Sequence, residues 1–199
     1  MALCLTILTQ LNPVVAEVVF RHEENQMRLD HIAYRVKDRN KTADFLKKTL
    51  DYRIATEFEV KFEDDSKAKC LVLEPSNKLE GVTWVESGAG RHVPPEIFVS
   101  NGTPNSIVDL WVSERGGQGG IHHLAYQVTN IEQRVKEWKE EGIEFLTEEV
   151  IECPDDDMKQ IFTKPLEALG GVIIELIQRG DQGFCKDSVK DLMQSTKEL

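Results

Sequence analysis

The sequence is poor in cysteine and has none of the paired spacings that would give cysteine a defined task. Its 199 residues include four cysteines, and no two of them form a Cys-x-x-Cys pair. A zinc ribbon or a dithiol redox motif is therefore not predicted. Scattered cysteines favour reduced thiols in a cytoplasmic protein, so we expect no structural disulfide at Cys70 or Cys153.

Long apolar runs and an excess of basic charge are also missing. No run approaches the roughly 20 residues of a membrane-spanning helix, and the apolar residues 1–11 lack the basic segment of a signal peptide. A net charge of −11 argues against nucleic acid or an anionic membrane as the main partner. With 40% hydrophobic and 30% charged residues, the composition is typical of a folded domain.

What the chain does contain is an internal repeat. Residues 29–36, Leu-Asp-His-Ile-Ala-Tyr-Arg-Val, are echoed by residues 121–128, Ile-His-His-Leu-Ala-Tyr-Gln-Val. His31 and His123 are equivalent in the two copies, 123 − 31 = 92 residues apart. Each copy has the alternation of a strand and is followed by a helix-forming stretch. The pattern predicts two β-α-β-β-β modules.

The repeat also predicts how the chain is divided. The expected parts are an N-terminal extension (1–27), a single domain of two modules (28–180, with modules at about 28–87 and 120–180 and a glycine-rich connector at 88–119), and a C-terminal helical tail (181–199). The last strands of the modules are expected at 81–86 and 171–178. The extension has two open roles, packing on the domain or mediating self-association as a homodimer.

Three polar residues are predicted to share one face of the sheet. Side chains alternate across a strand, so His31 and His123 face one side, whereas His122 is expected to face the other. Glu175 lies in Val-Ile-Ile-Glu-Leu-Ile, a run too apolar for a carboxylate without a partner or a metal ion. Two histidines and one carboxylate are typical of a divalent-metal site with open coordination positions.

These modules and positions resemble the vicinal oxygen chelate (glyoxalase/dioxygenase) superfamily over about residues 28–180. The resemblance implies an α+β fold in which paired β-α-β-β-β modules form a cup-shaped mixed sheet around a metal ion. It also implies that His31, His123 and Glu175 are the metal ligands.

The second half is most similar to the C-terminal catalytic half of 4-hydroxyphenylpyruvate dioxygenase. The similar strings are Gln160-Ile-Phe-Thr-Lys-Pro165, Glu175-Leu-Ile-Gln-Arg179 and Gly183-Phe184 before the terminal helix. The resemblance implies an Fe(II)-dependent oxidoreductase that oxygenates a 2-oxo acid. It places Gln160, Phe162 and Phe184 in the substrate pocket.

A second resemblance, to methylmalonyl-CoA epimerase and glyoxalase I, keeps an alternative open. Those enzymes take a fourth metal ligand from the last strand of the first module. Matching Gly81-Val82 with Gly171-Val172 places Val85 opposite Glu175, and valine cannot bind a metal; a one-residue bulge would place Glu86 there instead. Three ligands favour oxygenase chemistry, and four favour an epimerase or lyase. A non-catalytic small-molecule binding protein of the same fold is the third interpretation.

Overall fold

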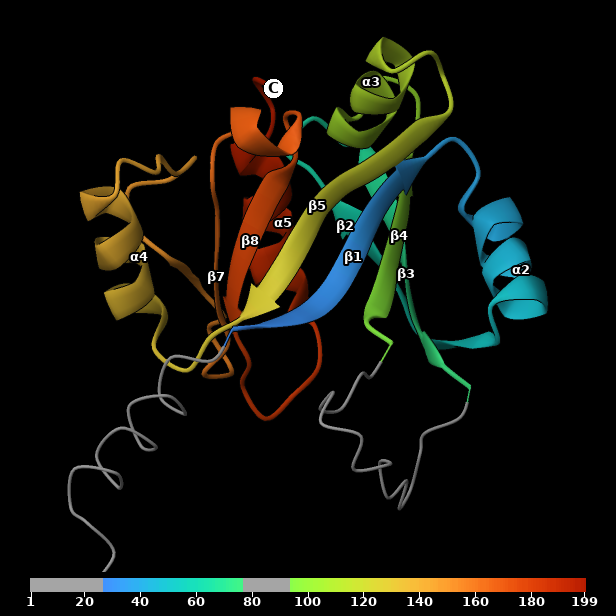
Figure 1. The fold of residues 1–199 in the computed structure, drawn as a ribbon. Helices are drawn as coiled ribbons and strands as arrows, with labels where there is room; N and C mark the ends of the chain where they lie inside the picture. Colours follow the sequence, from blue (N-terminus) through green and yellow to red (C-terminus); the bar gives the residue numbers. More distant parts are fainter. Residues whose placement is uncertain (1–26, 77–93) are drawn as a thin grey trace, which may run out of the picture.

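The structure, a computed structural model, describes residues 27–76 and 94–199 (Figure 1). Its elements in chain order are β1 (Arg28–Val36), α2 (Arg39–Thr49), β2 (Tyr52–Lys61), β3 (Lys67–Pro75), β4 (Glu96–Gly102), α3 (Ile107–Glu114), β5 (Gly119–Gln127), α4 (Ile131–Glu140), β6 (Ile151–Glu152), β7 (Lys159–Phe162), the 3₁₀ turn η1 (Glu167–Leu169), β8 (Ile173–Gln178) and α5 (Lys186–Ser195). Nearly all of the predicted extension, and the strand predicted at 81–86 with Val85 and Glu86, lie outside the described residues.

The strands form one curled mixed sheet in the order β2-β3-β4-β1-β5-β8-β7-β6. β1 and β5 form the antiparallel pair at its centre. β1 also pairs in parallel with β4, and β5 pairs in parallel with β8. The two halves of the sheet therefore repeat one arrangement on either side of the central pair, which confirms the predicted α+β fold of paired β-α-β-β-β units.

The helices that follow the two central strands begin in the same way. The Asp38 side chain accepts hydrogen bonds from the backbone N–H groups of Asn40 and Lys41 at the start of α2. The Asn130 side chain accepts one from the N–H of Gln133 at the start of α4. Such N-caps satisfy N–H groups that the first turn leaves free. The two caps are 130 − 38 = 92 residues apart, the same offset as the two histidines.

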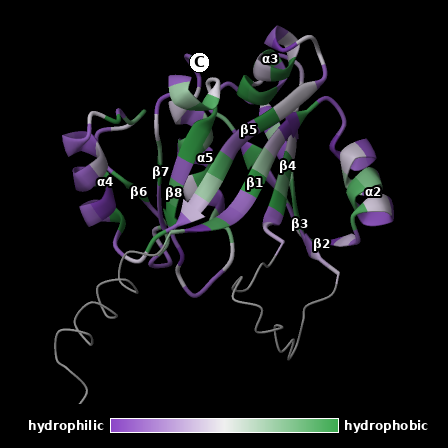
Figure 2. Cartoon of the chain, viewed as in Figure 1, coloured by the Kyte–Doolittle hydropathy of each residue, from purple (hydrophilic) through white to green (hydrophobic). Residues whose placement is uncertain are grey.

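The two faces of the sheet carry different helices. α2 and α4 each cover one half of the outer face, where Leu46 packs with Leu71 and Val135 packs with Leu176. α5 lies behind β5 and β8 in Figure 1 and packs against both halves of the inner face, through Met193 on one side and Leu192 on the other. Figure 2 shows β8 mainly hydrophobic and α4 largely hydrophilic, as expected for a strand inside the sheet and an outer helix.

Residues 96–114 differ from the connector expected there. They form β4 and α3, and β4 pairs with β1 in the way that β8 pairs with β5. The last strand of the first half is therefore β4 and not the segment 81–86. The sequence of β4, Glu-Ile-Phe-Val-Ser-Asn-Gly, has no likeness to that of β8, so the repeat was not visible there.

The strand that the predicted β-α-β-β-β module requires directly after α4, at residues 143–151, is mostly absent. Phe145 makes a single bridge to Thr163, and only Ile151 and Glu152 form a short strand. Between them the hydroxyl of Thr147 donates a hydrogen bond to the backbone carbonyl of Glu149. This local bond takes the place of ladder pairing in a polar stretch.

The prediction of no structural disulfide at Cys153 is wrong, because Cys153 is bonded to Cys185. The two are 32 residues apart in sequence, and the fold brings their Cα atoms within 6.0 Å, a normal disulfide separation. The bond joins the end of β6 to the residue before α5. Cys70 is free and buried, as expected.

Candidate metal centre

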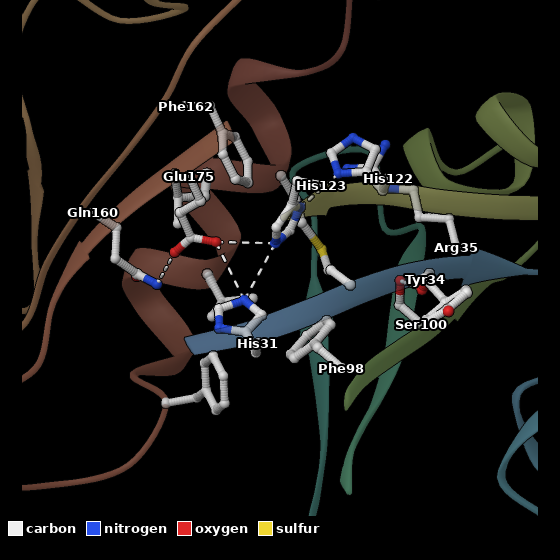
Figure 3. A pocket seen from close by; sticks show the side chains of 15 residues that line it. His31, Tyr34, Arg35, Phe98, Ser100, His122, His123, Gln160, Phe162 and Glu175 are labelled. Atoms are coloured by element: carbon white, nitrogen blue, oxygen red, sulfur yellow. Dashed lines mark hydrogen bonds and ion pairs between the residues drawn. The ribbon is translucent and has the colours of Figure 1, made fainter. Parts of the chain in front are cut away.

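His31, Glu175 and His123 meet on the inner face of the sheet, on three adjacent strands (Figure 3). Glu175 Oε2 lies 3.3 Å from His31 Nε2 and 2.9 Å from His123 Nε2, and the two Nε2 atoms are 3.3 Å apart. A divalent ion about 2.1 Å from each ligand atom needs neighbouring ligand atoms about 3 Å apart, as they are here. All three side chains are buried. The donor set therefore fits a divalent metal ion.

Two β-bulges shape this cluster. The β1–β5 pairing skips Asp30 on β1 and His122 on β5, the residues immediately before the two histidines of the cluster. An extra residue in one strand lets two consecutive side chains point to nearly the same side. Gly119 permits this path on β5, because it has φ +81° and a Cβ there would overlap the carbonyl oxygen of Arg35.

Each bulge residue contacts the Nδ1 atom of the histidine that follows it. Asp30 Oδ1 lies 2.8 Å from His31 Nδ1, and His122 Nδ1 lies 2.8 Å from His123 Nδ1. Asp30 is in turn held by Arg179, whose Nε donates to Asp30 Oδ2 at 3.0 Å. Partners on Nδ1 orient an imidazole and leave Nε2 for a metal.

The prediction that His122 faces away from His123 is wrong, and the bulge is the reason. His122 is buried and lines the same cavity as the cluster. The period-two rule assumes unbroken pairing, and Ala33 pairs with His123 while Tyr34 pairs with Ile121. The roles of Asp30 and Arg179 were also missed, and the place of Asp30 directly before a histidine of the repeat was the signal available.

Glu175 is held from its other side by a short chain of hydrogen bonds. Gln160 Nε2 donates to Glu175 Oε1 at 2.7 Å, and Ser188 Oγ donates to Gln160 Oε1 at 2.9 Å. Ser188 lies on α5, so this chain connects the helix over the inner face with the carboxylate of the cluster. It also fixes which Glu175 oxygen faces the histidines.

The charges of the cluster favour a single proton on His31. Burial alone would lower the pKa of His31. The carboxylates of Glu175 and Asp30 outweigh this effect and raise the pKa of His31 to about 9. Burial would raise the pKa of Glu175, yet the two histidines hold it well below its usual value. Burial lowers the pKa of His123, and Glu175 offsets only part of that effect. A metal ion must therefore displace a proton from His31.

The position equivalent to Glu175 in the first half is occupied by Phe98. Glu175 pairs with Ala125, two residues after His123, and Phe98 pairs with Ala33, two residues after His31. Phenylalanine cannot bind a metal ion. The matching of Val85 with Glu175 is therefore wrong, since β4 and not the segment 81–86 is the counterpart of β8.

The cluster lies at one side of a small buried cavity. Gln160, Phe162 and Phe184, the three residues predicted for the substrate pocket, all line it with His31, His123 and Glu175. The Phe162 ring lies 4.7 Å from the His123 ring, and the Phe184 ring lies 5.1 Å from the His31 ring. The cavity volume is about 30 Å³, enough for a water molecule or two. Val189, Leu192 and Met193 of α5 close it.

A sequence profile of the Glyoxalase/Bleomycin resistance protein/Dioxygenase superfamily matches residues 30–162, more than half of the chain. The protein belongs to this superfamily, which is the vicinal oxygen chelate superfamily that the sequence resembles. No curated protein sequence matches the chain.

Solved structures of two enzyme types resemble the fold. A variant of 4-hydroxymandelate synthase from Streptomyces coelicolor matches 86% of this chain with a TM-score of 0.66 and 19% identity, and the chain spans 54% of its length. Methylmalonyl-CoA epimerase matches 75% of this chain with a TM-score of 0.55 and 22% identity, over 93% of its own length. The enzyme of that name from Mycobacterium tuberculosis matches 75% with a TM-score of 0.52 and 20% identity, over 86% of its length. At these identities the similarity shows the fold alone.

Within residues 27–76 and 94–199, no helix has the length and apolarity needed to cross a membrane.

Proposed function

We propose that the protein is an Fe(II)-dependent oxidoreductase that oxygenates a 2-oxo acid. The observation that carries the proposal is the cluster of three possible ligand atoms, from His31, His123 and Glu175. Phe98 occupies the position in the sheet from which a fourth ligand would come. Two histidines and one carboxylate, with coordination positions left open, are the donor set of non-haem Fe(II) oxygenases. A 2-oxo acid and O2 would use the positions that the three protein ligands leave open.

The chain's own residues would hold and shield the reaction site. His31, His123 and Glu175 would bind the metal, with Asp30, His122 and Gln160 fixing their orientations. A divalent iron ion bound there would orient the 2-oxo acid and activate O2. Phe162 and Phe184 would line the space for the organic group, and α5 would exclude water once the substrate is inside.

The alternative is an epimerase or lyase of the methylmalonyl-CoA epimerase or glyoxalase I type. It needs a fourth protein ligand, and Phe98 does not supply one. Glu86 lies outside the described residues, so the choice rests on Phe98. A non-catalytic binding protein of the same fold has less support, since a buried metal-ligand set with oriented imidazoles is costly to keep without a metal.

The test is metal analysis of anaerobically purified protein, followed by O2 consumption with a panel of 2-oxo acids. We expect one iron per chain and substrate-dependent O2 uptake. His31→Ala, His123→Ala and Glu175→Ala should each lose metal severely, whereas Glu167→Ala, which changes an exposed carboxylate, should not. Full metal retention in all three variants would place the site elsewhere. Proton exchange at a CoA thioester without O2 uptake would support the epimerase alternative.

A further inference from the structure

Arg35 is a buried cation without an anionic partner. It lies four residues after His31 on β1, on the same face, and the residue is 3% exposed. Nη2 donates a hydrogen bond to Thr196 Oγ1 at 2.8 Å, and Nη1 has no partner. Among the described residues no carboxylate forms an ion pair with it. A buried charge is costly unless it is paired.

His122 presents a second unpartnered atom to the same cavity. It is 3% exposed, and its Nε2 makes no hydrogen bond. When His123 binds a metal through Nε2, its proton is on Nδ1 and is donated to His122 Nδ1, 2.8 Å away. A neutral His122 then carries its own proton on Nε2. The unpartnered atoms of Arg35 and His122 are then both hydrogen-bond donors.

Both residues line the cavity beside the metal cluster, and both lie near Trp111. The His122 ring is 5.4 Å from the Trp111 ring, and the Arg35 guanidinium is 5.9 Å from the same ring. Figure 3 shows both side chains on the side of His123 away from Glu175. The Arg115 guanidinium stacks on the Trp111 ring at 3.9 Å and adds a second positive charge near the cavity. The buried hydroxyl of Ser100 also lines the cavity, opposite Arg35 in the sheet.

We propose that Arg35 and His122 form an anion-binding subsite, and that the substrate is a 2-oxo acid with a second carboxylate that binds there. The inference rests on the proposed function for one part only, the binding of the 2-oxo acid group to the metal. With the cavity of about 30 Å³ widened by a movement of α5, the 2-oxo acid group would bind the metal, and the second carboxylate would accept hydrogen bonds from Arg35 Nη1 and His122 Nε2. Such charge-assisted bonds are the strong ones.

A water molecule or a purely structural role explains these residues less well. A water molecule could accept one or two hydrogen bonds, but it would leave the guanidinium charge without a counter-ion. A role in holding α5 uses only Nη2, through Thr196, and leaves Nη1 unexplained. An acidic ligand accounts for both donors and for the charge.

The experiment compares two acids of equal chain length, 2-oxoglutarate and 2-oxopentanoate, which differ in one terminal carboxylate. Their binding to the Fe(II)-loaded protein is measured anaerobically by calorimetry. Wild-type protein should bind 2-oxoglutarate roughly tenfold or more tightly than 2-oxopentanoate. Arg35→Leu should remove the preference by weakening 2-oxoglutarate binding roughly tenfold or more, and Arg35→Lys should keep part of it.

Thr196→Val is the matched control, because it removes the hydrogen bond that Arg35 makes to α5 and leaves Nη1 untouched. It should keep the preference for 2-oxoglutarate. Equal binding of both acids by wild-type protein would overturn the subsite while leaving the proposed function standing. Loss of the preference in Thr196→Val, as in Arg35→Leu, would overturn it in favour of a structural role for Arg35.

A second measurement separates the subsite from the metal site. If neither acid binds the Fe(II)-loaded protein, the proposed function fails, and the subsite is tested with succinate on metal-free protein by thermal unfolding. Succinate should then raise the Tm of wild-type protein and leave that of Arg35→Leu unchanged. No rise in wild-type protein would overturn the subsite as well.

Discussion

Phe98 and Glu175 occupy equivalent positions in the two halves of the sheet, each paired with the alanine two residues after a histidine of the cluster. The pseudo-symmetry of the fold thus defines a position for a fourth ligand, and in this chain a phenylalanine, Phe98, stands there. The Phe98 ring lies 6.4 Å from the His31 ring and 5.4 Å from the Phe184 ring. It belongs to the wall of the cavity and keeps one side of the metal centre apolar.

Phe98→Glu should convert the three-ligand site into a four-ligand site. We expect metal affinity to rise by about tenfold or more, a gain of about 1.4 kcal/mol. The metal-free variant should be less stable, because two buried carboxylates would face each other. Calorimetric metal titration and thermal unfolding with and without metal measure both effects. Phe98→Leu, which adds no ligand, is the control and should bind metal like wild-type protein; equal affinity in Phe98→Glu would show that residue 98 does not face the metal.

The proton on His31 predicts opposite pH effects on stability and on metal binding. The folded-state pKa of about 9 exceeds the usual value of 6.5. Protonated His31 therefore contributes on the order of 3 kcal/mol to the free energy of unfolding of the metal-free protein. This contribution is complete below about pH 6.5 and is lost as the pH rises through about 9. Metal affinity should rise over the same interval, because less work is needed to remove the proton.

Chemical denaturation of metal-free protein at pH 6, 7.5 and 9 measures the first effect, and metal titration at the same pH values measures the second. His31→Asn should flatten the stability profile, since the titrating group is gone. A wild-type profile that does not fall between pH 6.5 and 9 would contradict the assignment of the proton to His31.

The three residues of the cluster could be predicted from the sequence because each left a local signal. His31 and His123 stand at equivalent places in a repeat whose copies form the central strand pair, and Glu175 stands in an otherwise apolar strand. Phe98 left no signal, because β4 and β8 share a place in the fold but no sequence. The orientation of His122 depends on how β5 pairs with β1, which no pattern within β5 reveals. The Cys153–Cys185 bond depends on where α5 packs.

Asp30 should control metal affinity without binding the metal. Its carboxylate holds the Nδ1 atom of His31 and is itself held by Arg179. Outer partners of this kind are worth about 10–100-fold in metal affinity, so Asp30→Ala should weaken metal binding by that factor. Glu96→Gln is the matched control, because Glu96 also accepts a hydrogen bond from Arg179, whereas the partner of His31 Nδ1 is Asp30. Metal titration of both variants tests this; an equal loss in the two would assign the effect to Arg179.

The disulfide should stabilise the fold by anchoring the start of α5. Closing a loop between residues 32 apart is worth roughly 3–4 kcal/mol in the chain-entropy estimate. We expect a Cys153→Ser, Cys185→Ser double variant to unfold at lower temperature and denaturant concentration than oxidised wild-type protein. Reductant should lower the Tm of wild-type protein and leave that of the double variant unchanged.

The same bond bears on access to the cavity. A volume of about 30 Å³ does not admit a 2-oxo acid, so a substrate of the proposed class would enter only if α5 moved. The disulfide fixes the end of α5 at Cys185, whereas the other end is tied at Thr196 by its hydrogen bond from Arg35. We therefore expect opening at the Thr196 end, with faster 2-oxo acid binding in Thr196→Val than in wild-type protein. Stopped-flow binding measures the rate; unchanged rates in Thr196→Val, with faster binding in the double cysteine variant, would place the opening at the Cys185 end instead.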